Sequence, residues 1–251
     1  MENKESRGKF PKAVPFVLAS VFFERFCSGG VFGKIEFHLK NRRHKIFSIF
    51  LAILAIFLNQ KLGFDSDVST ALFHINEFIL YFFAIVGAII ADSWLGSFKT
   101  ILWMTVLFAL GSGIVAVASV DSLELPVIFV SLFGLLIIVI ASGGSKTNQS
   151  VFGGNQFKLP EQERQLNQFF SIQYFVLKCG ILLGQILIPV LRNDVKCFGM
   201  NNCFPLAFGV PAISMMVLFV ILMSGRSFYI HMPLSGNMFV KVCDCVLVRN
   251  Y

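Results

Sequence analysis

Charged residues are scarce in this chain of 251 residues, and the scarcity excludes a broad class of protein. They make up 14% of the sequence, against about 25% in an ordinary soluble domain. Hydrophobic residues make up 56%, and the mean hydropathy is +0.75. A soluble fold of this size could not cover so much apolar surface. The composition therefore indicates a membrane protein, with the lipid bilayer as its solvent.

Cysteine is also scarce. The six cysteines show neither the paired C-x-x-C spacing of a zinc site nor the density of a disulfide scaffold, and we predict no metal and no cofactor. The polar start MENKESRGKFPK leads into an apolar run without a small-residue cleavage site, so we expect no cleaved signal peptide.

The sequence also lacks the usual features of nucleic-acid-binding proteins and of enzymes. The net charge of +7 comes from basic residues scattered through loops, with no interleaved aromatic residues on which bases could stack, so no nucleic acid is expected as a partner. No paired aspartates lie within the apolar runs and no serine and histidine share a helical face. We therefore do not expect an enzyme.

The apolar runs predict an all-α membrane protein with six spans. Residues 101–120, 125–145 and 204–225 are free of charge over about a membrane's thickness. Residues 68–91 and 169–191 carry ionisable side chains, which we expect to face a protein interior or a water-filled cavity.

The start of the chain admits two interpretations. Residues 13–32 and 46–62 are apolar, but a strongly basic insert at about 31–51 separates them, so either one broken helix or two spans would fit. Counting one span with a cytoplasmic N-terminus agrees with the positive-inside tendency, except that the insert falls on the wrong side. The expected divisions are a cytoplasmic N-terminus at 1–12, a six-helix bundle at 13–225 and a cytoplasmic segment at 226–251.

Polar residues inside the predicted spans fall on single helical faces. His74, Glu77 and Tyr81 follow one another at i, i+3 and i+7, so they share one face of their span. Glu24 and Arg25 lie side by side in an otherwise apolar run, where burial is costly and ionisable residues usually mark a pathway.

A second polar face lies in the span at 169–191, where Tyr174, Lys178 and Gln185 follow at i, i+4 and i+11. Lys146 lies between two glycine pairs at the end of the preceding span. Such faces are typical of a polar cavity wall, although each of the uncharged side chains could equally make one interhelical hydrogen bond.

Short motifs then show a resemblance. GAIIADSWLGSFKT resembles the loop between spans two and three of the major facilitator superfamily, with Gly87, Asp92, Gly96 and Lys99 at its glycine, acidic, glycine and basic positions. The order and separation of ERF, STALFH, GGSK, FGGNQF, FFSIQYF and FPLAFGVPA resemble the animal branch of the proton-coupled oligopeptide transporter family. The resemblance covers nearly the whole chain apart from the basic insert.

The resemblance implies a twelve-helix transporter of which this chain matches the first six helices. The cavity of such a fold lies between two halves that rock against each other, so the resemblance implies that a second, C-terminal half is needed for a complete cavity. It implies di- and tripeptides and protons as partners and the plasma membrane as location. A shortened isoform that does not transport, an incomplete gene model and a regulatory half stay open as alternatives.

The resemblance also implies roles for proton coupling. Glu24 matches the second glutamate of the family's E-x-x-E-R motif, whereas the first falls on Val21. His74 matches a histidine implicated in proton handling. Because Val21 removes one carboxyl, we expect Glu77 to restore the charge balance and to join Glu24 and His74 in proton coupling.

The implied substrate-binding residues are five. Arg25 matches the arginine of the motif, Lys146 the basic residue of span four, and Tyr81 and Tyr174 match cavity tyrosines. Lys178 stands where the family has a substrate-binding asparagine, so a neutral amide has become a cation.

Two cysteines lie close enough in the sequence to form a disulfide within one loop. Cys197 and Cys203 lie in a loop expected outside the cell, where they form either a disulfide or two free thiols.

Overall fold

The computed structural model describes residues 10–32, 53–120, 126–195, 197, 202–230 and 232. Six long helices dominate these residues: α1 (Val14–Phe32), α3 (Ser66–Ile90), α4 (Ser97–Ala118), α5 (Val127–Gly154), α6 (Glu163–Asp194) and α7 (Phe204–Ser224). The short elements are α2 (Ile53–Gln60), the π-helix η2 (Ala91–Leu95) and the 3-10 helix η3 (Arg226–Phe228).

The six long helices are each long and apolar enough to cross a membrane, α3 being counted together with η2. The prediction of an all-α, six-helix membrane bundle is therefore confirmed. Within the described residues, helix α2 has 8 residues and spans about 12 Å, less than a hydrocarbon core of about 30 Å. Most of the basic insert at about 31–51 lies outside the described residues and stays a prediction.

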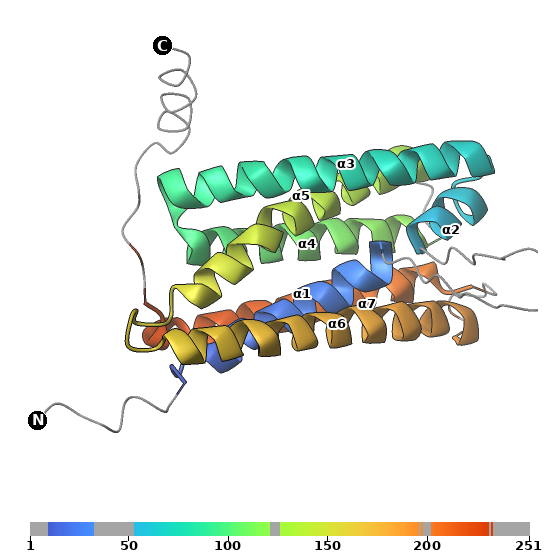
Figure 1. Ribbon diagram of the computed structural model, residues 1–251. Coiled ribbons are helices and arrows are strands. Elements are labelled where there is room, and N and C mark those ends of the chain that lie inside the picture. The colour runs from blue at the N-terminus through green and yellow to red at the C-terminus, as the bar shows by residue number, and fades with distance from the viewer. Residues whose placement is uncertain are drawn as a thin grey trace, which may run out of the picture.

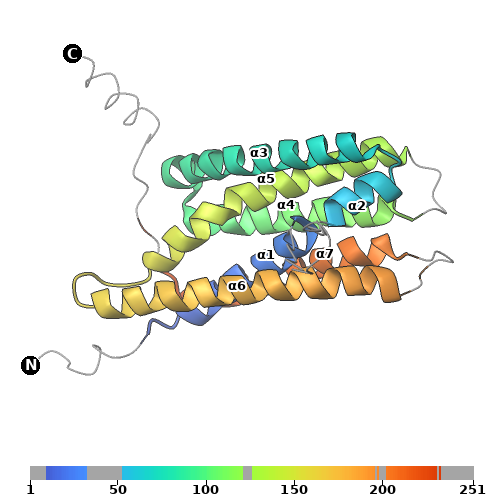
Figure 2. The same cartoon turned by 45° about the vertical axis from the view of Figure 1, so that its right-hand side comes forward.

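The helices form two groups, visible in both ribbon views. Helices α3, α4 and α5 lie together on one side, and α1, α6 and α7 lie together on the other (Figures 1 and 2). Within the groups α4 packs on α5, α3 on α5 and α1 on α6, while α4 joins the groups by packing on α7. Helices α3 and α6 are the least buried of the six, and α1 is the most buried.

Glycines allow α1 and α6 to approach to backbone contact. A Cβ atom on Gly180 of α6 would lie 2.8 Å from the carbonyl oxygen of Phe22, and one on Gly184 would overlap the carbonyl oxygen of Phe26. On α1, a Cβ atom on Gly29 would lie 2.9 Å from the Cα atom of Ile181. Because lipid gives helices little hydrophobic reason to associate, such close van der Waals packing is a main source of their attraction.

Helices α3 and α5 meet in the same way. A Cβ atom on Gly87 would lie 2.5 Å from the Cα atom of Gly144, and one on Gly143 would overlap the carbonyl oxygen of Leu80. The side chain of Asn148 donates to the carbonyl oxygen of Gly87 at 3.0 Å. The contact therefore fixes the position of α3 relative to α5 at two levels.

A buried aromatic cluster holds the segment after α7 against the bundle. The Tyr229 ring lies 5.1 Å from the rings of Phe98 and Phe152, on α4 and α5. The Gln156 side chain accepts a hydrogen bond from the Ile230 backbone N–H at 2.9 Å and donates to the Ile230 carbonyl oxygen at 3.3 Å. These contacts fix the direction in which the chain leaves α7.

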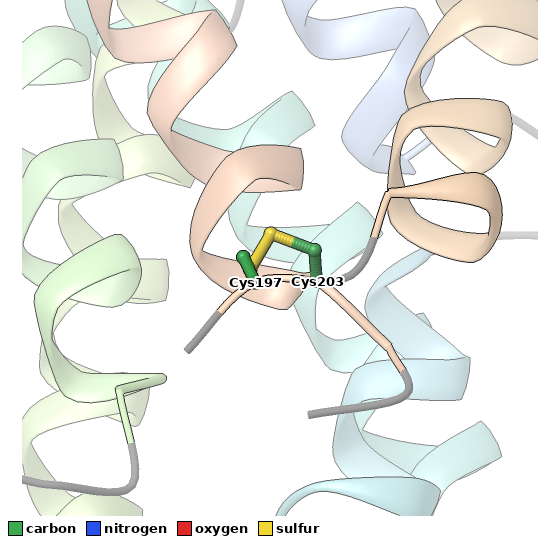
Figure 3. The surroundings of a disulfide bond; sticks show 2 residues. All are labelled: Cys197 and Cys203. Atoms are coloured by element: carbon green, nitrogen blue, oxygen red, sulfur yellow. A yellow bond between two sulfur atoms is a disulfide. The ribbon is translucent and has the colours of Figure 1, made fainter. Parts of the chain in front are cut away.

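The opposite end of α7 carries a disulfide. Cys197 and Cys203 are bonded, with their Cα atoms 5.4 Å apart (Figure 3). The Cys203 backbone N–H donates to the carbonyl oxygen of Arg192 at 2.8 Å, and the Arg192 guanidinium lies 5.0 Å from the Phe204 ring. Of the two alternatives for these cysteines, a disulfide or two free thiols, the structure therefore has the disulfide.

Candidate functional site

A buried ion pair lies at the centre of α1. The Arg25 Nε atom lies 3.1 Å from Glu24 Oε2, and the Glu24 side chain is only 2% exposed. The contact is not aligned as a hydrogen bond. Ser142 of α5 donates a hydrogen bond to the other carboxylate oxygen, Oε1, at 3.1 Å. The carboxylate is thus held between its neighbour on α1 and a hydroxyl on α5.

Lys146 lies one helical turn after Ser142 and extends from α5 toward α3. Its Nζ atom lies 4.5 Å from the centre of the Tyr81 ring, a distance at which a cation is attracted to an aromatic face. Lys146 is also within electrostatic range of Arg25, Glu24 and Glu77. Charges from α1, α3 and α5 therefore act on one another.

These groups border an open cavity of about 230 Å³ between α1, α3, α5 and α6. Two cations, Arg25 and Lys146, and one acid, Glu77, contribute to its lining. The rest of the lining is uncharged and consists of Ser28, Gly29, Phe32, Phe73, Asn76, Leu80, Tyr81, Ser142, Ile181 and Gln185. A cavity with both signs of charge can hold a ligand that also carries both.

Helix α3 presents its predicted polar face toward this region. Glu77 and Tyr81 line the cavity, and His74 Nδ1 lies 3.5 Å from Glu77 Oε2. His74 itself is 63% exposed and does not contribute to the lining. The three residues lie along one face of α3, as their spacing predicts.

The polar face of α6 divides between two environments. Gln185 lines the cavity, whereas Tyr174 and Lys178 are exposed and lie outside its lining. The Lys178 Nζ atom lies 5.2 Å from the centre of the Tyr174 ring. The lining on α6 starts at Ile181, and Lys178 precedes it by about one turn. Lys178 thus does not line the cavity with Arg25 and Lys146.

The residues of the predicted loop motif lie where α3 turns into α4. Gly87 is the contact point with α5, and Asp92 lies within the π-helix η2. Gly96 has φ +81°, a left-handed conformation that favours glycine and lets the chain reverse. Lys99 is exposed in the first turn of α4.

Neither a metal site nor a second cavity between helices stands out among the described residues. Within the described ranges, no group of three or more His, Cys, Asp or Glu side chains could hold a metal ion. A wider depression is lined by Glu163, Arg164, Asn167, Gln168 and Ser171. All of these belong to the start of α6 alone, so they form the surface of one helix, whereas the charged cavity joins four helices.

The sequence profile described as the POT family matches residues 98–250. That range covers more than half of the chain. The chain belongs to the POT family. The resemblance drawn from the short motifs is therefore confirmed.

Relatives within the POT family are named as transporters. The chain is 40% identical over 237 residues to Peptide transporter family 1 of Drosophila melanogaster, covering 94% of this chain and 29% of that protein. It is 35% identical over 260 residues to Solute carrier family 15 member 1 of Rattus norvegicus, covering 98% and 34%. The chain thus spans about a third of the length of these relatives. They are named as transporters or solute carriers, not as enzymes.

Solved POT family structures share the fold. The crystal structure of the transporter PepTSo matches with a TM-score of 0.70 and 28% identity, over 91% of this chain and 40% of that one. A second structure, a proton dependent oligopeptide family transporter, matches with a TM-score of 0.68 and 26% identity, over 93% and 45%. The six helices of this chain thus form part of a POT transporter fold in a multi-pass integral membrane protein.

Some residues of the site were missed from the sequence. Ser142 donates a hydrogen bond to Glu24 and orients it. The one available sequence signal was that Ser142 precedes Lys146 by four residues and so shares its helical face. Asn76 and Ser28 also line the cavity; Asn76 neighbours Glu77, and Ser28 follows Arg25 by three residues on α1. Small polar side chains are common in apolar helices, so no sequence signal separated these from the rest.

Proposed function

We propose that the chain supplies one wall of the substrate cavity of a proton-coupled transporter for di- and tripeptides or similar solutes in the plasma membrane. The observation that carries the proposal is the cavity itself, where Arg25 and Lys146 face Glu77 in a POT fold. A peptide is a zwitterion, and a site that accepts varied side chains must recognise its charged ends. Charge-assisted contacts are the strong means of doing so. The protein acts as a carrier and not as an enzyme.

Arg25 and Lys146 would bind the substrate carboxylate, with Tyr81 packing beside Lys146. The pairing of Arg25 with Glu24 restrains the guanidinium. Protonation of Glu24 would weaken that pair and free Arg25 for the substrate, so proton and peptide binding would share one set of charges. Tyr174 and Lys178 would contribute from α6 once a second bundle covers that exposed face.

Proton coupling would use Glu24, His74 and Glu77. Val21, which occupies the position of the family's first glutamate, is buried at 1% exposure and offers no titratable group. Glu77 lies beside His74 and within electrostatic range of Lys146. It would therefore supply the negative charge that is missing because Val21 replaces the family's first glutamate. The motif of Gly87, Asp92, Gly96 and Lys99 would serve the movement of one bundle against the other.

Uptake of a radiolabelled dipeptide tests the proposal. Cells would express this chain joined to the remaining C-terminal part of the Drosophila relative, and uptake would be measured at acidic and neutral external pH. We expect saturable uptake that acid stimulates, and a loss of roughly tenfold or more in Lys146→Gln, since a charge-assisted contact is removed. Lys158→Gln, an exposed loop residue, serves as the matched control.

Two outcomes would contradict the proposal. An absence of uptake at every pH would favour the alternative of a product that does not transport. Equal uptake by the parent and Lys146→Gln would remove the cavity from the mechanism. For the proton step, Glu77→Gln should flatten the pH dependence and Val21→Glu should restore it, whereas an unchanged profile in Glu77→Gln would exclude Glu77 as a proton carrier.

A further inference from the structure

Three consecutive side chains of α5 directly follow Lys146, and each donates a hydrogen bond to a backbone carbonyl oxygen of a neighbouring helix. The bonds run from Thr147 to Ala84 and from Asn148 to Gly87 on α3, both at 3.0 Å, and from Gln149 to Ser20 on α1 at 3.3 Å. Successive helical residues point about 100° apart, so the three bonds hold α5 on two sides. They fix its rotation at the level where the Lys146 side chain leaves the helix.

Asn148 is bonded to both sides of the crossing of α3 and α5. The residue is 2% exposed, and its amide nitrogen donates to the carbonyl oxygen of Gly87 at 3.0 Å and to that of Gly144, on its own helix, at 2.7 Å. Because both neighbours are acceptors, the nitrogen of the amide and not its oxygen must face them. Gly87 and Gly144 are also the glycines at which the two backbones touch.

The Gly87 carbonyl oxygen lies where α3 changes its geometry. The Ala91 N–H is shared between the carbonyl oxygens of Gly87 and Ala88. From Ala91 the chain continues as the π-helix η2, and the Gly96 N–H donates to the carbonyl oxygen five residues back, that of Ala91, at 2.8 Å. Single π-helical turns are rare and are frequent at functional sites. Asn148 thus supplies a second donor to the carbonyl at which the wider turn begins.

Asn148 therefore stands between the cavity and the loop motif. Lys146, two residues before it, lines the cavity, whereas its acceptor Gly87 is the first residue of the motif. Two further motif residues belong to the same turn, since Asp92 lies inside η2 and Gly96 ends it. Because the backbones touch at Gly87 and the bond to Asn148 spans 3.0 Å, a rotation or shift of α5 must displace the start of η2.

Thr147 offers a comparison within the same pair of helices. It also joins α5 to α3, but its acceptor Ala84 lies about one turn before Gly87, inside the regular part of α3. Loss of either bond weakens the contact between the two helices, whereas only the bond of Asn148 acts directly on the start of η2. A role in packing alone can therefore be distinguished from a role in coupling.

We propose that Asn148 is a positioning residue that couples the segment of α5 carrying Lys146 to the π-helix η2 between α3 and α4. It acts through the Gly87 carbonyl oxygen and does not belong to the cavity lining. The inference rests on the proposed function, because it assigns the contact by which a change at the cavity reaches the motif that serves bundle movement. Loss of this contact should slow turnover without weakening the binding of substrate.

Hydrogen–deuterium exchange with mass spectrometry tests the local part, on the chain in lipid nanodiscs. Asn148→Ala removes both bonds of the side chain. Asn148→Ser separates them, because a serine hydroxyl reaches the carbonyl oxygen four residues back on its own helix and is too short to reach α3. In both variants the amides of residues 91–96 should exchange roughly threefold to tenfold faster than in the parent, the factor that one hydrogen bond allows.

Thr147→Val is the matched control, because it removes the other bond to α3 and keeps the size of the side chain. It should leave the exchange of residues 91–96 as in the parent. Unchanged exchange in Asn148→Ser, or an equal rise in Thr147→Val, overturns the coupling. If Asn148→Ala does not fold, Asn148→Ser decides.

Uptake kinetics test the functional part, in the fusion with the C-terminal part of the Drosophila relative and with rates normalised to the amount of transporter at the cell surface. Asn148→Ser should lower the maximal rate roughly threefold to tenfold and leave the KM for a dipeptide unchanged. Thr147→Val should keep both values. A variant that is merely less stable loses surface protein, which the normalisation removes.

The outcomes separate this inference from the proposed function. An unchanged maximal rate in Asn148→Ser, or a raised KM in its place, overturns the inference and leaves the proposed function standing. Absence of uptake by the parent refutes the proposed function and the effect on turnover with it, whereas the exchange experiment then still decides whether Asn148 controls η2.

Discussion

Replacing Gly184 with alanine should weaken the packing of α6 on α1. A Cβ atom at that position would overlap the Phe26 carbonyl oxygen and lie 2.9 Å from the Gly30 nitrogen. Both atoms belong to the α1 backbone, so no change of side-chain rotamer can relieve the overlap. The two helices must move apart and lose contacts along their crossing.

The size of the effect follows from two opposing contributions. Overpacking a tight interface costs about 1–3 kcal/mol, whereas exchanging a helical glycine for alanine gains about 0.5–1 kcal/mol. Gly113→Ala in α4 is the matched control, because a Cβ atom there meets nothing within 4 Å. It should show the gain alone. The free energy of unfolding of Gly184→Ala should therefore fall below that of Gly113→Ala by roughly 1–3 kcal/mol, the cost of the overlap.

Equilibrium unfolding in mixed micelles of increasing SDS content measures this difference, with helical circular dichroism as the signal. Both variants should keep the parent's helical content before the transition. Equal free energies of unfolding for the two variants would refute the backbone contact between α1 and α6. A loss in Gly113→Ala as large as that in Gly184→Ala would do the same.

Three further predictions concern other parts of the bundle. Mass spectrometry of unreduced peptides should find Cys197 joined to Cys203, and recovery of both as free thiols would contradict the bond. Ser142→Ala should lower the free energy of unfolding by about 1.5–3 kcal/mol, because it removes a hydrogen bond to a buried carboxylate. Ser224→Ala, at an exposed position, should leave the free energy of unfolding within about 0.5 kcal/mol of the parent's value. Burial raises the pKa of Tyr229 to about 12, from the ordinary tyrosine value of about 10. The buried neutral phenol therefore contributes fully to stability below pH 10, and this contribution is lost as the pH rises through 12. Tyr229→Phe should remove the step near pH 12 from a tyrosinate absorbance titration, and persistence of that step would show that another tyrosine produces it.

Hydropathy was sufficient to predict the six spans, because each helix must fill the bilayer with apolar residues. The prediction at 204–225 differs from α7 (Phe204–Ser224) by a single residue. The polar ends of the helices were harder to predict from hydropathy. Helix α5 (Val127–Gly154) continues well beyond the predicted end at 145, since its backbone hydrogen bonds continue past the apolar run. A charge-free window therefore locates a span and underestimates the helix.

The candidate site could be predicted only along individual helices. Spacing placed His74, Glu77 and Tyr81 on one face of α3, because a helix repeats every 3.6 residues. It could not show that Ser142 bonds to Glu24, or that Lys178 lies outside the cavity. Both facts depend on how far one helix is shifted along another. Glycine contacts set that shift, and sequence periodicity contains no measure of it.

The contact of α3 with α5 also limits how the cavity could distinguish ligands by length. Gly143 meets the Leu80 carbonyl oxygen between the levels of Glu77 and Lys146, so this backbone contact sets the spacing of the two helices that carry these side chains. Each extra peptide residue lengthens a ligand by about 3.3–3.6 Å. Because the contact is between backbones, the spacing of α3 and α5 does not widen to admit a longer chain. If both dipeptides and tripeptides are carried, the difference in length is taken up elsewhere, by the long side chains of Arg25 and Lys146 reaching to different depths or by the second bundle.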